Sequence, residues 1–362
     1  MEISVVLPVH NCGKYLLPAL QSLKYQSYPH FEVLMVNDHS SDDSDLVCAD
    51  FASVDDRFCL LDSPYSGMAR ALNYGISQAS GVYIARMDGD DVSAPDRFAK
   101  QVEFLQENPD IAFLGTFADH IDENGKVTGS FEFPEDDLEI KAHLDRGTNT
   151  FVHPSMMIRH KALKDLGGYR DVFSICQDYD LWLRAQERYA FANLPEKLLQ
   201  YRGFPQKRDL NGRFWRYFYV TKLAEISAQQ RRSGQMDPVE QMVDEFDVEA
   251  IDDRMIRQQL LSARQDYYCN KKAFLDKKPL NSMDIEQVTT FLLTNKSSFN
   301  KKTLSNAYEL LFDQALRIED IESAEILYKL QRDVSKSRHI KSMLTKPNKL
   351  VKYALRKRLE EA

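Results

Sequence analysis

The chain has 362 residues, which is longer than one ordinary domain and long enough for a sizeable core. It carries 47 basic and 55 acidic residues, a formal net charge of −8, and no motif of a folded nucleic-acid-binding module. Its five cysteines lack a Cys-x-x-Cys pair and so indicate neither a disulfide framework nor a zinc site. Without a basic amino-terminal region before an apolar stretch, or any apolar run of ~18 residues, we expect no signal peptide and no spanning helix.

The first 86 residues alternate between short apolar segments and amphipathic ones. Spacing and β-branched content predict strands over 3–7, 31–36, 58–61 and 81–85, and helices over 15–25, 44–51 and 68–79. Near-continuous apolar strands alternating with helices predict an α/β protein with a mostly parallel, doubly wound sheet.

Three aspartates follow directly on the last of these strands. Asp88, Asp90 and Asp91 lie within four residues, and in open α/β sheets ligands gather beyond the carboxyl ends of the strands. Hard cations such as Mg²⁺ or Mn²⁺ take oxygen ligands, and close carboxylates repel one another unless a cation or hydrogen-bond donors stabilise them. An isolated Asp-Gly-Asp is more often a turn, but its position after a buried strand favours a metal site.

The next segments read as a helix over 96–105, a strand over 111–117 and a hairpin turn over 122–126. Further on, Gln177-Asp178-Tyr179-Asp180 precedes an apolar helical pattern that includes Trp182. One of the polar residues is expected to cap this helix. We assign the cap to Asp180 or Gln177.

Four motifs occur in order along the first part of the chain. They read Val-Val-Leu-Pro-Val-His-Asn at 5–11, Val-Asn-Asp-His-Ser at 36–40, Gly-Met-Ala-Arg-Ala-Leu-Asn-Tyr-Gly-Ile at 67–76 and Asp-Gly-Asp-Asp at 88–91. Over about residues 1–205 the chain resembles the family 2 glycosyltransferases, whose nucleotide-sugar-binding fold is called GT-A. The resemblance implies a Rossmann-like sheet and an activity that transfers a sugar from a nucleotide.

The resemblance also implies roles for single residues. A nucleotide site would use Pro8, Val9, Asp38, Gly67, Asn73 and Asp88. Within it, Asp38 would accept from the uracil ring N–H, although a helix-capping role is the alternative for this residue, and Asp88 would contact the ribose. Asp90 would bind the Mn²⁺ or Mg²⁺ cofactor.

The segment at 177–184 resembles the catalytic segment of the family. Asp178 occupies the place of the general base, although Gln177 stands where the family usually has Glu. An acceptor hydroxyl needs a positioned base, and direct displacement at the anomeric carbon inverts its configuration. The resemblance therefore implies an inverting transferase.

Weaker candidates for the site are Arg70, Asp91, His153, Trp182 and Arg202. Arg70 would contact phosphate or lie on a solvated helix face, and His153 would lie near the sugar or be a structural histidine. Many relatives carry a histidine shortly after the Tyr-Arg pair that ends at Arg202. This chain has Gly-Phe-Pro at 203–205 instead.

A polar stretch at 229–235 suggests a boundary between a catalytic domain over 1–228 and a helical region over 236–335. The tail over 336–362 has nine basic and two acidic residues, with apolar residues on one side of a possible helix. Such basic amphipathic helices bind anionic membrane surfaces, whereas a solvated tail or a nucleic-acid contact is the alternative. We favour the membrane and expect no nucleic-acid partner.

Together these features predict transfer of a hexose from a UDP-sugar to a glycan, with a lipid-linked acceptor of surface polysaccharide or lipopolysaccharide synthesis. The protein would be cytoplasmic and peripheral on the inner face of the cell membrane. A non-catalytic nucleotide-sugar-binding module is the first alternative, motivated by Gln177, Leu72 and Phe204. A sugar-phosphate nucleotidyltransferase is the second, but it normally has a glycine-rich basic loop near its amino terminus.

Overall fold

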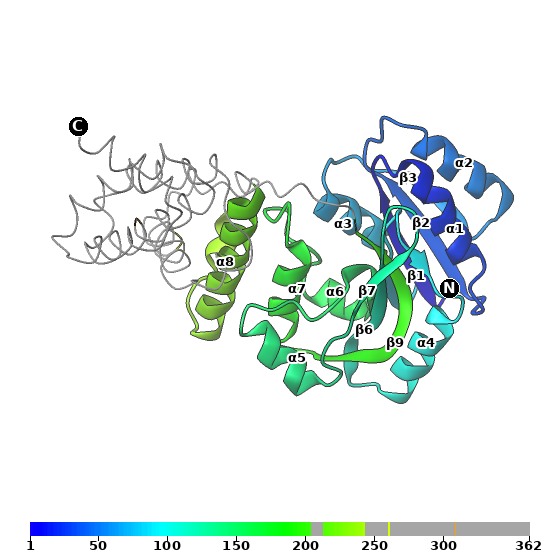
Figure 1. Ribbon diagram of the computed structural model, residues 1–362. Helices are drawn as coiled ribbons and strands as arrows, with labels where there is room; N and C mark the ends of the chain where they lie inside the picture. Colours follow the sequence, from blue (N-terminus) through cyan, green and yellow to red (C-terminus); the bar gives the residue numbers. More distant parts are fainter. Residues whose placement is uncertain (204–212, 243–259, 261–307, 309–362) are drawn as a thin grey trace, which may run out of the picture. The chain divides into compact units, whose positions relative to one another are not determined.

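The computed structural model describes residues 1–203 and 213–242, together with residues 260 and 308 (Figure 1). Contacts divide the chain into a unit formed by Met1–Lys207 with Val220–Ile251 and a second unit formed by the rest. The first unit carries all the candidate site residues. Most of the helical region expected over 236–335, and the whole tail over 336–362, lie outside the described residues, so those domain bounds stay predictions.

Strands and helices alternate as the sequence predicts, with small shifts at their ends. The strands are β1 (Ile3–Val9), β2 (Phe31–Asn37), β3 (Phe58–Asp62), β4 (Tyr83–Arg86), β5 (Val92–Ser93), β6 (Ile111–Ile121), β7 (Val127–Phe131), β8 (Met157–Arg159) and β9 (Ala190–Arg202). The helices are α1 (Leu16–Lys24), α2 (Ser44–Val54), α3 (Met68–Gln78), α4 (Arg97–Glu107), α5 (Asp137–Leu144), α6 (His160–Asp165), α7 (Gln177–Ala185) and α8 (Arg213–Arg232). Short 3₁₀ turns, η1 (Gly13–Tyr15), η2 (His153–Ser155) and η3 (Pro238–Gln241), complete the described elements.

The first four strands form the parallel half of the sheet. They lie side by side in the order β3-β2-β1-β4, and every neighbouring pair is parallel. Their carboxyl ends therefore share one edge, where the loops after β1, β2 and β4 meet. This confirms the α/β fold and the parallel arrangement expected from the sequence.

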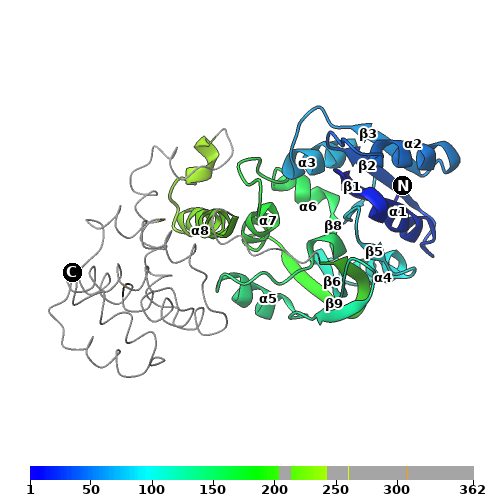
Figure 2. The same ribbon diagram turned by 45° about the horizontal axis from the view of Figure 1, so that its top comes forward.

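Both faces of this half are buried. Val5 and Leu7 belong to one core cluster with Leu16 and Leu20 of α1, whereas Val6 faces α3, where a Cβ built on Gly75 would lie 2.6 Å from a Val6 methyl. Figures 1 and 2 show α1 and α2 on one side of β1–β3 and α3 on the other. Because helices cover both faces, the strands read as almost unbroken apolar runs.

The other half of the sheet mixes directions. Strand β8 is antiparallel to both β4 and β6, β6 is parallel to β9, and β7 pairs with β6 across the predicted hairpin turn at 122–126. Strand β5 is antiparallel to β9. The loop between β4 and β5 therefore begins in the parallel half and ends against β9. It is anchored on both sides.

Helix α8 runs through residue 228, the end of the predicted catalytic domain. Among the helices that the structure describes, none is both long enough and apolar enough to span a bilayer.

Candidate functional site

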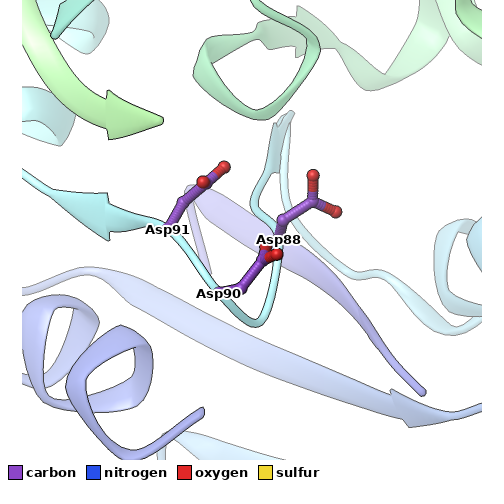
Figure 3. Close-up of side chains that lie close together, drawn as sticks. All are labelled: Asp88, Asp90 and Asp91. Carbon is purple, nitrogen blue, oxygen red and sulfur yellow. The ribbon is translucent and has the colours of Figure 1, made fainter. Parts of the chain in front are cut away.

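The loop between β4 and β5 carries the three aspartates predicted to bind metal (Figure 3). One oxygen of each carboxylate of Asp88, Asp90 and Asp91 lies within 4.8 Å of the others. Asp88 and Asp90 are half-buried, whereas Asp91 is 1% exposed. The sequence thus brings together, in one turn of the chain, the oxygen ligands that hard divalent cations prefer.

The electrostatics of this cluster also suit a cation. Burial and the charge of Asp88 raise the pKa of Asp90 to about 6, and burial with both neighbouring charges raises the pKa of Asp91 well above its ordinary value. The Oδ2 atom of Asp91 is buried without a hydrogen-bond partner. A divalent cation would satisfy that oxygen and lower the pKa of Asp90 and of Asp91, so these residues fit Mn²⁺ or Mg²⁺.

Two arginines support the aspartate loop from opposite sides. The backbone N–H of Arg202, at the end of β9, donates to Asp91 Oδ1 (2.8 Å), and its Nε donates to the Asp90 carbonyl oxygen (2.8 Å). The fully buried Arg97 donates from Nη2 to the carbonyl oxygen of Arg86 (2.9 Å). Arg202, a weaker ligand-binding candidate, is therefore a support of the loop, because its guanidinium already bonds the protein backbone.

Arg86 is a residue that sequence reasoning missed. It ends β4, is 4% exposed and forms an ion pair with Asp88, while its Nε has no hydrogen-bond partner. Its charge also opposes the pKa rises of Asp90, Asp91 and Asp178. A buried cation therefore acts electrostatically on both the aspartate cluster and the candidate base. In the sequence, Arg86 could have been noticed because it lies two residues before the run of carboxylates.

Asp38, the predicted nucleotide residue after β2, bonds both Gly67 and Val9. Both oxygens of Asp38 accept from the Gly67 N–H (3.0 Å each), and the Asp38 N–H donates to the Val9 carbonyl oxygen (2.8 Å). Gly67 has φ +110°, a conformation that side-chain-bearing residues rarely adopt. A carboxylate has further acceptor sites, so the uracil role of Asp38 stays a prediction.

Pro8 and Val9, expected in the nucleotide site, are the last two residues of β1. Both side chains are buried, and Val9 is 0% exposed within the core of β1. The residues that follow are exposed instead: the His10 Nδ1–H donates to the Asp38 carbonyl oxygen (2.6 Å), and Asn11 has φ +52°. Asn11 Oδ1 accepts from the Ser41 N–H (2.7 Å), which ties the two strand-end loops together. The sequence motif at 5–11 includes all four residues but does not show which of them are buried and which are exposed.

Helix α3 does not present its candidate residues freely. The Asn73 side chain pairs with the Tyr169 backbone, with Nδ2 donating to the carbonyl oxygen (2.7 Å) and Oδ1 accepting from the N–H (2.9 Å). Arg70 forms an exposed ion pair with Asp171 (3.2 Å). Both ends of the Asn73 amide are therefore bonded within the protein, and its expected nucleotide contact stays a prediction.

Asp178 lies in the first turn of α7. The residue before the helix, Cys176, has φ +57° and makes no side-chain cap. Asp180 lies inside the helix and is 0% exposed, so the predicted capping by Asp180 or Gln177 is wrong. Asn11 and His39, which follow β1 and β2, also have positive φ angles, a strained conformation for residues with a side chain. Among the residues that the structure describes, all non-glycine residues with positive φ therefore lie beside the candidate site.

The carboxylate of Asp178 is half-buried and faces a polar loop. Asn149 Nδ2 lies 3.4 Å from Asp178 Oδ2 and donates to it. Desolvation raises the pKa of Asp178, opposed by the Tyr179 N–H, by Arg86 and by Asn149. A raised pKa strengthens a carboxylate as a proton acceptor, provided that it stays ionised at the working pH. Asn149 was not identified from the sequence.

Two weaker candidates belong to the core. Trp182 is 0% exposed and packs edge-on against Phe113 and Phe151. His153 is 8% exposed, its Nε2 lies 2.8 Å from the Tyr169 hydroxyl, and burial and the charge of Arg86 hold its pKa well below the usual value. His153 is thus a neutral, hydrogen-bonded structural histidine, and neither side chain is available to a ligand.

Comparison with known proteins identifies relatives of this arrangement. The chain matches the model of the family described as Glycosyl transferase family 2 over residues 4–167. The presumed glycosyltransferase EpsE of Bacillus subtilis is 34% identical over 206 residues, which cover 56% of this chain and 73% of EpsE. The O-antigen biosynthesis glycosyltransferase WbnJ of Escherichia coli is 31% identical over 204 residues, covering 55% and 79%. The crystal structure of S. aureus TarS 1-349 with UDP-GlcNAc aligns with a TM-score of 0.53 at 16% identity over 92% of this chain and 88% of TarS, a likeness of fold.

Proposed function

Since this chain belongs to glycosyltransferase family 2 and has the GT-A fold, its activity is sugar transfer, and we propose that it moves a hexose from a UDP-sugar to a glycan acceptor with inversion. The observation that carries the proposal is the carboxylate cluster of Asp88, Asp90 and Asp91, together with Asp178, whose pKa is raised by desolvation and held back by the same buried Arg86 that pairs with Asp88. Metal-binding and proton-accepting carboxylates are kept distinct by their surroundings.

The aspartate loop would hold the donor. Asp90 and Asp91 offer oxygens to Mn²⁺ or Mg²⁺, and Asp88, beside them, is available to the ribose. A bound divalent cation supplies charge neutralisation for the diphosphate that leaves. By its resemblance to the family, Asp38, directly after β2, would accept from the ring N–H of a uracil base. The proposal therefore names UDP as the carrier.

Asp178 would act on the acceptor. Its carboxylate takes the proton of the acceptor hydroxyl, the hydroxyl oxygen forms a bond to the anomeric carbon, and the bond from that carbon to the diphosphate oxygen breaks. Attack from the face opposite the leaving group turns an α-linked donor into a β-linked product. Asn149 and Arg86 keep Asp178 ionised for this step, since both favour its charged form.

The acceptor we propose is lipid-linked. One relative is named for O-antigen biosynthesis, and the 27 residues from 336 to 362 carry nine basic and two acidic residues on a chain whose formal charge is −8. Each cation close to an anionic membrane contributes about 1 kcal/mol to binding. The basic tail would thus bring the protein to the inner membrane face, where a lipid-linked saccharide is held.

Calorimetry on the full chain tests the donor. UDP-glucose, UDP-galactose, their N-acetyl forms and GDP-mannose are titrated with and without Mn²⁺, into wild type and Asp90→Ala. We expect binding of a UDP-sugar that needs Mn²⁺ and is lost in the variant. Equal binding without Mn²⁺, or preference for GDP-mannose, would refute the donor and cofactor proposed.

The tail is tested separately by co-sedimentation with vesicles of anionic phospholipid. Truncation after Ser335 is expected to abolish sedimentation and to reduce transfer to a lipid-linked saccharide. Unchanged sedimentation and transfer would refute the membrane role.

A further inference from the structure

A buried ionic network joins the helix of Asp178 to the segment that follows α8. We call it the α7–α8 network, and its side chains share hydrogen bonds and ion pairs without a break. Its members are Arg170, Asp180, Arg184, Glu187, Ser227, Arg231 and Asp237. Three arginines face three carboxylates, so the charges balance.

Arg170 lies at the centre of the network. Its Nε donates to Asp180 Oδ2 (3.0 Å), its Nη2 pairs with Asp180 Oδ1, and its Nη1 donates to Asp237 Oδ2 (2.7 Å). The carboxylates of Asp180 and Asp237 are 1% and 2% exposed. The fork of one guanidinium thus holds two buried carboxylates that are 57 residues apart in the sequence. A lysine could not hold both in this geometry.

Asp180 also fixes the loop before α7. Arg184, one turn further along the helix, donates from Nε to Asp180 Oδ2 (3.0 Å). Its other nitrogens donate to the carbonyl oxygens of Leu166 and Gly168 (2.7 Å each). Four hydrogen bonds therefore hold Asp180 and Arg184 of α7 to the segment before the helix. Asp180 lies two residues from Asp178.

The far end of the network lies on α8 and η3. Asp237 accepts from the Ser227 hydroxyl and from Arg231 Nη1 (2.7 Å each), and Arg231 Nη2 donates to Glu187 just beyond the end of α7 (2.8 Å). Although burial raises it, the pKa of Asp237 falls to about 2, because Arg170 and hydrogen bonds from Val239, Arg231 and Ser227 stabilise the charge. Asp237 is therefore ionised across the physiological range.

Such a network responds as a whole to the loss of one member. Removing one partner leaves a buried charge unpaired, and the surrounding segments must shift to solvate it. The segment with the greatest functional consequence is the first turn of α7, because Asp178 lies there and a displacement of about 1 Å at a reacting group can cost on the order of 100-fold in rate.

We propose that the α7–α8 network is a positioning device, in which Arg170, Arg231 and Asp237 set the place of the base Asp178 from the α8–η3 segment. This inference rests on the proposed function of Asp178. If the network positions Asp178, the rate of transfer depends on residues that lie outside the sheet and contact no substrate, whereas the affinity for the donor does not.

Adjacent arginines on α8 offer a matched test. Arg231 belongs to the network, whereas Arg232 makes an exposed ion pair with Asp145, with side chains 40% and 52% exposed. Arg231→Gln and Arg232→Gln are the same change at neighbouring positions. Asp237→Asn and Arg170→Lys probe the network from its other members with small changes of shape. For each full-length variant, UDP release from the UDP-sugar that wild type binds, with water as acceptor, gives kcat, and calorimetry gives the donor Kd and the number of sites.

We expect Arg231→Gln, Asp237→Asn and Arg170→Lys to lower kcat by about 10- to 100-fold. Their donor Kd and number of sites should match those of Arg232→Gln, which keeps wild-type kcat. Two results would overturn the proposal: an unchanged kcat in the network variants, or a loss of kcat that only follows a loss of donor-binding sites, as misfolding produces. Failure of the proposed function would give a different result: wild type would release no UDP, or Asp178→Asn would release it at the wild-type rate. Either result would also overturn the positioning role.

Discussion

Residues on the donor side of the site follow directly on the ends of parallel strands, whereas Asp178 lies on a helix held by side chains from distant segments. Asp38 and the aspartate cluster need only β2 and β4 to bring them to the same sheet edge. Helix α7, which carries Asp178, is bonded through Asp180 to Arg170 in the loop before it, and Arg170 in turn pairs with Asp237 beyond α8. The strands therefore bring the proposed donor side to the sheet edge, where arginines support its loop, whereas the helix of the proposed base is held by charge pairs between distant segments.

The largest effect should come from Asp178→Asn. The amide cannot accept the acceptor proton, so kcat is expected to fall by about 10²- to 10⁴-fold. UDP release under saturating Mn²⁺ measures it, with the exposed ion-pair variant Asp165→Asn as control. Retained activity would assign the base elsewhere and remove the contrast between the two sides.

Protons should compete with the cation at Asp90. Because its pKa is raised to about 6 in the cation-free protein, metal binding must displace a proton below that pH. Through Asp90, the apparent Mn²⁺ affinity should then fall by up to about 10-fold per pH unit below pH 6. Calorimetry between pH 5 and 8 tests this, and an affinity independent of pH would contradict it.

The same shift has a consequence for stability. The folded state binds more protons than the unfolded state between the ordinary Asp pKa and about 6. Through Asp90, unfolding free energy is therefore highest below this window, falls as pH rises through it and stays reduced above pH 6. In EDTA, changing Asp90 to Asn should remove this contribution to the pH dependence of unfolding; an identical profile in variant and wild type would contradict it.

A smaller effect is expected from Asn149→Ala. This change removes a long hydrogen bond that lowers the pKa of Asp178, so the acidic limb of kcat/KM should move to higher pH by less than about one unit. The group must be ionised to act, and fewer molecules are ionised at low pH. A shift to lower pH would contradict this assignment.

The smallest effect should come from Arg70→Ala. Its ion pair with Asp171 is exposed, and such pairs contribute about 0–1 kcal/mol to the free energy of unfolding. Donor Kd should stay within about twofold, a change worth less than about 0.5 kcal/mol. A tenfold weaker Kd would restore Arg70 as a phosphate contact and show that α3 takes part in donor binding.

This contrast also explains what the sequence could predict. The strands, the helices of the parallel half and the aspartate cluster follow from local patterns, because a strand that ends in carboxylates places them at the sheet edge whatever lies elsewhere. The capping role of Asp180 was wrong because its partners, Arg170 and Arg184, become visible only after folding. The bonds of the Asn73 amide could not be predicted for the same reason, as it pairs with Tyr169 across 96 residues.

Which residues of one motif are buried and which reach the surface is also hard to predict from the motif alone. Trp182 lies in the same motif as Asp178, yet it turns into the core against Phe113, while Asp178 stays near the surface. Helical spacing separates these two positions only if the direction of the core is known. Arg86 could have been identified earlier, since a buried strand rarely ends in an arginine without a charged partner.

The most direct test compares donor affinity and UDP release in Asp90→Ala and Asp178→Asn, measured on the same preparations with the UDP-sugar that wild type binds. We predict that Asp90→Ala loses Mn²⁺-dependent donor binding and release together, whereas Asp178→Asn keeps wild-type, Mn²⁺-dependent binding and loses release. Loss of donor binding in both variants, or release by Asp178→Asn at the wild-type rate, would contradict the division of the site into a donor side and a base side.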